Sequence, residues 1–255
     1  MGRSSIGATS VAPLTIADLR PSVGRRRREG LVRRVFFAAA ATSVLINVLI
    51  VVTLLDGTVD FLNSVDLRLL WSDGWFPRRG LFDIRTIVAG TLLVSVVAIV
   101  VAAPLGLGTA MYLSEYASRR SRRRLKPILE ILAGIPSVVM GYFALTWISP
   151  NIMQRFFDAG AFSLGAAGIG VGILITPLVA SVAEDAMYAV PGSLREASSG
   201  LGARKRSTSI RVVFPAAISG IVAALILGIS RAIGETLVVA IAAGATGGSL
   251  FNLDV

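Results

Sequence analysis

Five long apolar runs constrain the fold of this chain more than any other feature of its sequence. They cover approximately residues 35–55, 84–113, 127–148, 162–189 and 212–243. Each run is long enough, at about 1.5 Å per helical residue, to cross a hydrocarbon core of about 30 Å. The chain is 54% hydrophobic and 16% charged, whereas soluble domains carry about a quarter charged residues. We therefore predict an all-α, polytopic membrane protein with five visible spans.

The residue types that are missing exclude most enzyme chemistry. The sequence has no cysteine and no histidine, which excludes disulfides, thiol catalysis, Ser/His triads and zinc sites that need imidazole or thiolate. Neither lysine, Lys126 or Lys205, follows the glycines of a phosphate-binding loop. The adjacent Glu184 and Asp185 face different directions on a helix, so we interpret them as solvated or interface residues. We expect no enzymatic activity and no cofactor in this chain.

The distribution of basic residues predicts the orientation of the spans. Most of the 25 Lys and Arg residues lie in residues 1–34, 114–126 and 195–211. The intervening connections carry few basic residues, and acids balance these. Short cytoplasmic loops are enriched in Lys and Arg, so we expect these three segments and the N-terminus to be cytoplasmic. The net charge of +10 is therefore a topology signal, and we expect no nucleic-acid partner.

These patterns divide the chain into four parts. Residues 1–34 are expected to form a disordered basic cytoplasmic tail, and residues 35–55 the first transmembrane helix. Residues 56–83 contain tryptophans suited to the membrane–water boundary and are predicted to be an external loop or interfacial segment. Residues 84–255 form the membrane core, with a projecting cytoplasmic loop at residues 190–214.

One charged pair lies inside an apolar run. Arg231 and Glu235 are four residues apart, so on a continuous helix they share one face and can pair. An arginine at the centre of a membrane helix costs about 2.5–3.5 kcal/mol to insert, so it must find partners or face a wet cavity. Either the pair only fixes helix packing, or the guanidinium serves an anion pathway from which Glu235 yields when an anion arrives.

A glycine and a proline interrupt the third run. The sequence Ala133-Gly134-Ile135-Pro136-Ser137 predicts either a simple proline kink or two half-helices, because proline removes one backbone hydrogen bond. If the helix is broken, the second half-helix begins near Ser137. Its free N–H groups and the Ser137 hydroxyl would then point at an anion.

The loop before the last run is similar to the signature loop of bacterial ABC importer permeases. That pattern reads Glu-Ala-Ala, three residues, Gly, nine residues, Ile-x-Leu-Pro. Glu196, Ala197, Gly202 and Pro215 match it at the required spacing. The departures, all of similar size or polarity, are Ser198, Val212 and Phe214.

Within this superfamily, residues 84–244 resemble the phosphate-specific (Pst) permeases of the C type. The motifs that carry this resemblance are Pro104–Gly108, Leu113–Ala117, Leu132–Gly141 and Arg231–Thr236. The resemblance implies the type I ABC importer permease fold, with six helices where five are visible, in a bacterial plasma membrane. It also implies that Glu196–Gly202 is the coupling helix and that Arg231 and Glu235 lie on the phosphate path. We add Thr236, Ser137 and Pro136 to that path.

The same resemblance implies four kinds of partner besides the lipid bilayer. These are a similar A-type permease, two copies of a cytoplasmic ATPase that binds ATP and Mg²⁺, and an extracytoplasmic phosphate-binding protein. Two alternatives stay open: a permease of the same architecture for sulfate or molybdate, and a membrane sensor or scaffold without transport. A channel that needs no ATPase is disfavoured by the intact signature loop.

Overall fold

The computed structural model describes residues 23–244, with the side chains of residues 29–71 and 74–244. The chain divides into two compact units, Met1–Asp66 and Leu67–Val255. The first unit consists, in its described part, of one helix, α1 (Val23–Ser64), which is 42 residues long. Its apolar stretch has no buried residues within the chain, as expected of a helix whose surroundings are lipid or partner proteins.

Helix α1 is longer than the apolar run that predicted it. It includes residues 23–34, which were expected to be disordered, and residues 56–64, which were assigned to the external segment. Residues 1–22 of the expected tail lie outside the described residues. The side chains of Thr42, Thr53 and Thr58 each donate to the carbonyl four residues earlier. These three hydroxyls therefore find partners within the helix, as a membrane helix requires.

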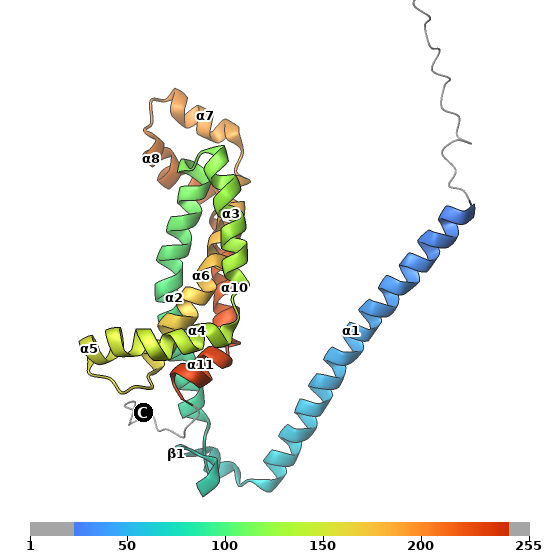
Figure 1. Cartoon of the computed structure of the whole chain (residues 1–255), viewed down its shortest axis with the longest axis vertical. Coiled ribbons are helices and arrows are strands. Elements are labelled where there is room, and N and C mark those ends of the chain that lie inside the picture. The colour runs from blue at the N-terminus through green and yellow to red at the C-terminus, as the bar shows by residue number, and fades with distance from the viewer. Residues whose placement is uncertain (1–22, 245–255) are drawn as a thin grey trace, which may run out of the picture. The chain divides into compact units, whose positions relative to one another are not determined.

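The second unit is a helical bundle that is preceded in the sequence by a short β-hairpin (Figure 1). Its first half contains η1 (Leu67–Leu70), β1 (Trp71–Phe76), η2 (Pro77–Arg79), β2 (Leu81–Asp83), α2 (Ile84–Met111), the π-helical η3 (Tyr112–Tyr116), α3 (Arg119–Ala133), α4 (Ser137–Phe143), the π-helical η4 (Ala144–Met153) and α5 (Gln154–Phe157). Its second half contains α6 (Leu164–Tyr188), α7 (Gly192–Gly200), α8 (Lys205–Thr208), the π-helical η5 (Ser209–Val213), α9 (Phe214–Ala216), α10 (Ile218–Ile233) and α11 (Leu237–Ala242).

The number of candidate membrane spans is three to five, and its upper limit equals the five predicted from the sequence. Among the described residues, three helices are long and apolar enough to cross a bilayer, and two pairs of helices become a fourth and a fifth span if each bent pair crosses as one. The pairs bend by 85° between α3 and α4 and by 72° between α9 and α10. Strands β1 and β2 pair antiparallel, with Trp71 opposite Asp83, and form a small β element within an otherwise helical fold.

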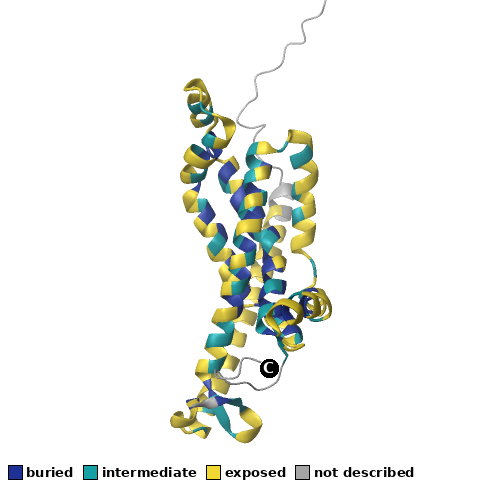
Figure 2. Cartoon of the chain, turned by 90° about the vertical axis from the view of Figure 1, so that its left-hand side faces the viewer, coloured by how far each residue is buried: buried dark blue, intermediate teal, exposed yellow. Residues whose placement is uncertain are grey.

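Helix α6 lies at the centre of the bundle. Two thirds of its apolar stretch is buried inside the chain, and Figure 2 shows buried positions concentrated along the inner helices. Glycines allow this close approach. A Cβ atom on Gly172 would lie 2.8 Å from the Ala98 carbonyl oxygen of α2, and one on Gly168 would lie 2.6 Å from Val97 Cβ. Small residues let membrane helices pack backbone to backbone.

We predict that Gly172→Val destabilises the fold by about 1–3 kcal/mol, since the Ala98 backbone cannot move aside for the new side chain. Gly108→Ala is the matched control, because a Cβ atom there meets nothing within 4 Å and the helix propensity improves. Thermal unfolding in detergent measures both variants. Equal midpoints for the two would contradict the packing argument.

The start of α2 is held by a buried carboxylate. Asp83 is 2% exposed and accepts hydrogen bonds from the Arg85 backbone N–H at 3.1 Å and the Thr86 hydroxyl at 2.6 Å. Burial alone would raise the pKa of this carboxyl, but hydrogen bonds from Thr86 and from the side chain and backbone of Arg85 outweigh it. They hold the pKa below its ordinary value of 3.8. Asp83 is therefore an ionised N-cap of α2.

We predict that Asp83→Ala lowers the free energy of unfolding at neutral pH by about 1 kcal/mol, the usual value of an N-cap. Because the folded-state pKa is lowered, this stabilisation is complete above the ordinary value of 3.8 and is lost as the pH falls through the lowered pKa. The difference between wild type and variant in thermal unfolding should therefore narrow in acid. A difference that is independent of pH would contradict this account.

Candidate functional site

The charged pair predicted from the sequence forms at a break between two helices. The Nη1 atom of Arg231, in the last turn of α10, lies 3.1 Å from Oε2 of Glu235. The pair forms although the helix is not continuous here, because α10 ends at Ile233 and α11 begins at Leu237. Gly234 caps α10 through its N–H, and the chain turns there.

Glu235 and Arg231 differ in exposure. The Glu235 side chain is 4% exposed, whereas that of Arg231 is 50% exposed within this chain. The second carboxylate oxygen, Oε1, accepts a hydrogen bond from the N–H of Val238 in the first turn of α11. Glu235 therefore pairs with the guanidinium and also makes a long contact of 3.5 Å with the first turn of α11. Because a guanidinium has five donors, Arg231 keeps donors that can bind an oxyanion while the pair is intact.

The third run is broken rather than kinked. Helix α3 ends at Ala133 and α4 begins at Ser137. The carbonyl of Pro136 accepts hydrogen bonds from the N–H groups of Val139 and Met140. No side chain caps the start of α4, so the N–H groups of its first two residues point out of the helix end, as at any helix N-terminus. Ser137 is half-buried there.

The two breaks lie in one region of the bundle. Figure 1 shows α11 beside α4, and a Cβ atom on Gly141 of α4 would lie 3.2 Å from Val238 Cα. Ile135 of the first break packs against the same apolar cluster as Ala232 and Val238. Among the described residues, however, no hydrogen bond joins Ser137 to Arg231. The structure therefore brings Arg231 and Glu235 into contact and leaves the first break as a neighbouring element.

Thr236 and Pro136, two other residues predicted for the phosphate path, each accept a backbone hydrogen bond at the start of a helix. The carbonyl of Thr236 accepts a hydrogen bond from the N–H of Ala240 and so begins α11. Pro136 begins α4 in the same way. Both residues are exposed, and their part in a substrate path stays a prediction.

The signature loop projects from the end of the bundle where α3 begins (Figure 1). Glu196 and Ala197 lie exposed on α7. Gly202 has φ +75°, a left-handed conformation that glycine adopts without strain. Its N–H bonds to the Ser199 carbonyl and ends the helix. Leu201 beside it is 89% exposed, so the loop presents a surface with an apolar tip.

Pro215 lies apart from this loop. It lies in α9, which is the last turn of the continuous helical stretch Lys205–Ala216. This short helix precedes the 72° bend into α10. Pro215 is therefore a residue of the connection to the last span and not of the projecting surface.

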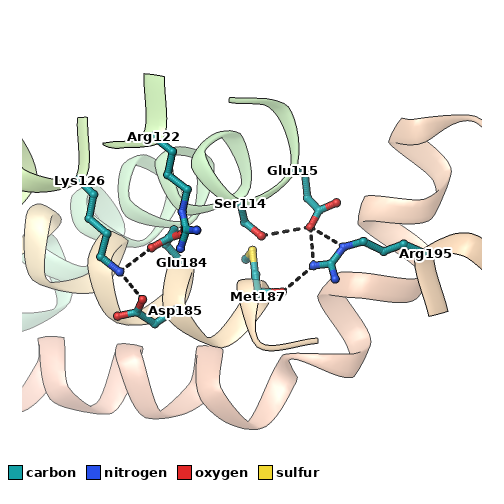
Figure 3. Close-up of polar contacts among 8 residues, drawn as sticks. All are labelled: Ser114, Glu115, Arg122, Lys126, Glu184, Asp185, Met187 and Arg195. Carbon is teal, nitrogen blue, oxygen red and sulfur yellow. Dashed lines mark hydrogen bonds and ion pairs between the residues drawn. The ribbon is translucent and has the colours of Figure 1, made fainter. Parts of the chain in front are cut away.

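A network of ion pairs joins α6 to α3 (Figure 3). Glu184 on α6 is 1% exposed, and its carboxylate bonds to Arg122 at 2.6 Å and to Lys126 at 3.0 Å, both on α3. Lys126 also pairs with Asp185, whose side chain is 61% exposed. Of the two roles predicted for these acids, solvated or interface, Glu184 has the interface role, because a carboxylate packed between two helices must be paired. The two acids differ in exposure, although both pair with Lys126.

A second ionic contact joins the loop to α2 and α6. The Arg195 guanidinium bonds to Oε1 of Glu115, with Nη2 at 2.9 Å, and to the Met187 carbonyl at 2.8 Å. Neither Glu115 nor Arg195 was predicted as a functional residue. The sequence does place Glu115 directly after the apolar run at residues 84–113, and an acid at that position needs a basic partner. That partner, Arg195, lies 80 residues away in the sequence.

Comparison with known proteins decides the family. The family described as "binding-protein-dependent transport system inner membrane component" matches residues 102–253. The chain belongs to this family. It is therefore a membrane component of an ABC transport system, multi-pass and of the type I importer permease fold, and not the ATPase. The resemblance stated from the signature loop is confirmed.

Three curated relatives show how far the similarity extends. The chain is 36% identical to a probable ABC transporter permease protein, YqgH, of Bacillus subtilis, over 74% of this chain and 59% of that protein. It is 32% identical to the phosphate transport system permease protein PstC of Mesorhizobium japonicum, over 86% of this chain and 74% of the relative. For PstC of Pasteurella multocida the identity is 30%, over 76% and 67%.

One similar solved structure is that of the MetNI methionine ABC transporter, determined in inward-facing conformations. The TM-score is 0.45 at 24% identity, over 58% of this chain and 66% of the MetNI chain.

Proposed function

We propose that this chain is a transmembrane permease subunit of an ATP-driven importer of inorganic phosphate. The observation that carries the proposal is the Arg231–Glu235 pair at the break between α10 and α11, in a chain whose relatives are named as phosphate transport system permeases. A guanidinium that is half exposed at membrane depth suits a tetrahedral oxyanion, because its planar fork offers several donors at once.

The geometry suggests how the pair would work. Arg231 attracts phosphate, and Glu235 holds the guanidinium in place when no phosphate is bound. Glu235 also has a long contact of 3.5 Å with the Val238 N–H, so the carboxylate keeps a second partner when the arginine binds an anion. The half-helix that begins at Ser137, with Pro136 before it and Thr236 on the neighbouring segment, lines the same region. Binding stays weak, because a tightly held anion would not leave.

The proposed assembly follows the relatives' names. A second permease similar to PstA 1 of Mycobacterium tuberculosis, to which this chain is 37% identical over 71% of its length, would form the other half of the path. Two cytoplasmic ATPases would bind ATP and Mg²⁺, and a phosphate-binding protein would deliver the substrate. The basic residues at the start of α3 and around α8 lie at one end of the bundle, which supports a cytoplasmic position for that end. The arginines of residues 1–34 favour the same side for the N-terminus.

We predict that Arg231→Ala lowers ATP-driven phosphate uptake by about 10- to 100-fold, the equivalent of a lost charged hydrogen bond of about 1.5–3 kcal/mol. Arg231→Lys should also be poor, because an ammonium lacks the fork. Uptake into proteoliposomes that contain the whole complex measures both variants. Arg119→Ala, at an exposed arginine that begins α3, is the control. Normal uptake by Arg231→Ala in an assembled complex would remove Arg231 from the path.

We predict that Gly202→Ala weakens association with the ATPase, because the new side chain is strained at φ +75° and reshapes the end of α7. Gly192→Ala is the matched control: a Cβ atom at either glycine meets nothing within 4 Å, but only Gly202 has a positive φ. Glu196→Lys, which reverses the charge beside Ala197 on the exposed face, should also detach the ATPase. Co-purification of the ATPase with each variant is the measurement. Full co-purification with Gly202→Ala and Glu196→Lys would defeat this assignment.

A further inference from the structure

One side chain connects the projecting helix α7 to two spans. Nη2 and Nε of Arg195 bond to Glu115 Oε1 at 2.9 and 3.2 Å. Nη1 bonds to the Val190 carbonyl, and Nη2 to the Met187 carbonyl at 2.8 Å. Glu115 belongs to η3 at the end of α2, and Met187 to the last turn of α6. Arg195 therefore ties α7 to the ends of α2 and α6 at once (Figure 3).

This contact has the features of a rigid junction. The last carbonyls of a helix lack intrahelical partners, and a nearby cation satisfies them and interacts well with the helix dipole. The Glu115 side chain is 6% exposed and that of Arg195 is 26% exposed, so water competes little for either group. The Ser114 hydroxyl donates to the same carboxylate oxygen and orients it. Charge-assisted bonds in such surroundings are short and directional.

The two faces of α7 carry different roles. Arg195 points into the bundle and is half-buried, whereas the next residue, Glu196, lies exposed with Ala197 on the outer face. A displacement applied to the outer face would therefore reach the spans through the side chain directly behind it.

A second set of contacts continues from α6 to the broken span. Glu184 lies on α6 three residues before Met187, and it bonds to Arg122 and Lys126 of α3. The Arg122 guanidinium also lies 3.5 Å from the ring centroid of Tyr188. Helix α3 ends at the break before Ser137. Charged contacts thus lead from α7 through the last turns of α6 to α3.

We propose that Arg195, held by Glu115, is the positioning residue through which movement of α7 is passed to α2 and α6, and from α6 to α3. The proposal rests on the proposed function, since it assumes that an ATPase acts on α7. It separates two properties of the loop: the exposed residues bind the ATPase, and Arg195 converts that binding into movement of the spans. Loss of Arg195 or Glu115 should therefore uncouple the transporter without detaching the ATPase.

The test uses Glu115→Gln and Arg195→Lys in the complete complex in proteoliposomes, with Arg119→Ala as the control. Glu115→Gln keeps the size of the side chain, so the fold should survive. We expect both variant complexes to contain the wild-type amount of ATPase and to continue to hydrolyse ATP. The amount of phosphate transported per ATP hydrolysed should fall roughly tenfold, the order of effect of a lost charged hydrogen bond. A wild-type ratio of transport to hydrolysis in both variants would overturn the proposal. Loss of the ATPase from the Glu115→Gln complex would also overturn it, because the contact would then serve docking.

A second readout does not depend on the substrate. The chain has no cysteine, so in a complex whose other subunits have been made cysteine-free a spin label can be placed on α3 alone through Ile131→Cys, at a position that is 73% exposed. Addition of ATP should change the spectrum of the label in the otherwise wild-type complex, and Arg195→Lys should abolish the change while hydrolysis continues. An unaltered response in Arg195→Lys would overturn the proposal. If the wild-type complex moved no phosphate but the label still responded through Arg195, the proposed substrate would fail and the inference would stand.

Discussion

The close packing of α6 against α2 is the constraint on which the rest of the bundle depends. Glycines at the contact let the two backbones approach so closely that a single Cβ atom on Gly172 would clash with a carbonyl oxygen. Membrane helices gain no hydrophobic energy from association in lipid, so such van der Waals contact and interhelical bonds must hold them together. With α6 fixed, its last turns present Glu184 and the Met187 carbonyl to α3 and α7.

Buried charges organise both ends of the described bundle in the same way. At one end, Glu184 and Glu115 each bond to basic residues from another element. At the other, Glu235 bonds to Arg231 and to the start of α11. A carboxylate removed from water costs several kcal/mol unless it is paired, so each acid fixes the position of its partner. The difference is that Arg231 stays half exposed, which leaves it able to bind an anion, whereas Arg195 has its donors directed at protein groups.

Sequence reasoning succeeded where the governing physics is local. Apolar runs predicted the spans, and the four-residue spacing predicted the Arg231–Glu235 pair. Proline and glycine located the interruption before Ser137 but left a kink and a break equally open. It failed where partners are distant: Glu184 lies 62 residues from Arg122, and Glu115 lies 80 residues from Arg195. Only the packing of α6 brings these groups together, and nothing in the sequence pattern specifies that packing. The break after Ile233 was missed because Gly234 is also compatible with a helix.

The central claim is that this chain forms half of an ATP-driven path for phosphate. The most direct measurement is ATP-dependent uptake of radiolabelled phosphate by proteoliposomes that contain the chain with its permease, ATPase and binding-protein partners, with excess sulfate or molybdate as competitor. The account predicts uptake that requires ATP and that neither competitor reduces. Uptake of sulfate or molybdate instead of phosphate, or an intact complex that hydrolyses ATP and accumulates no phosphate, would contradict it.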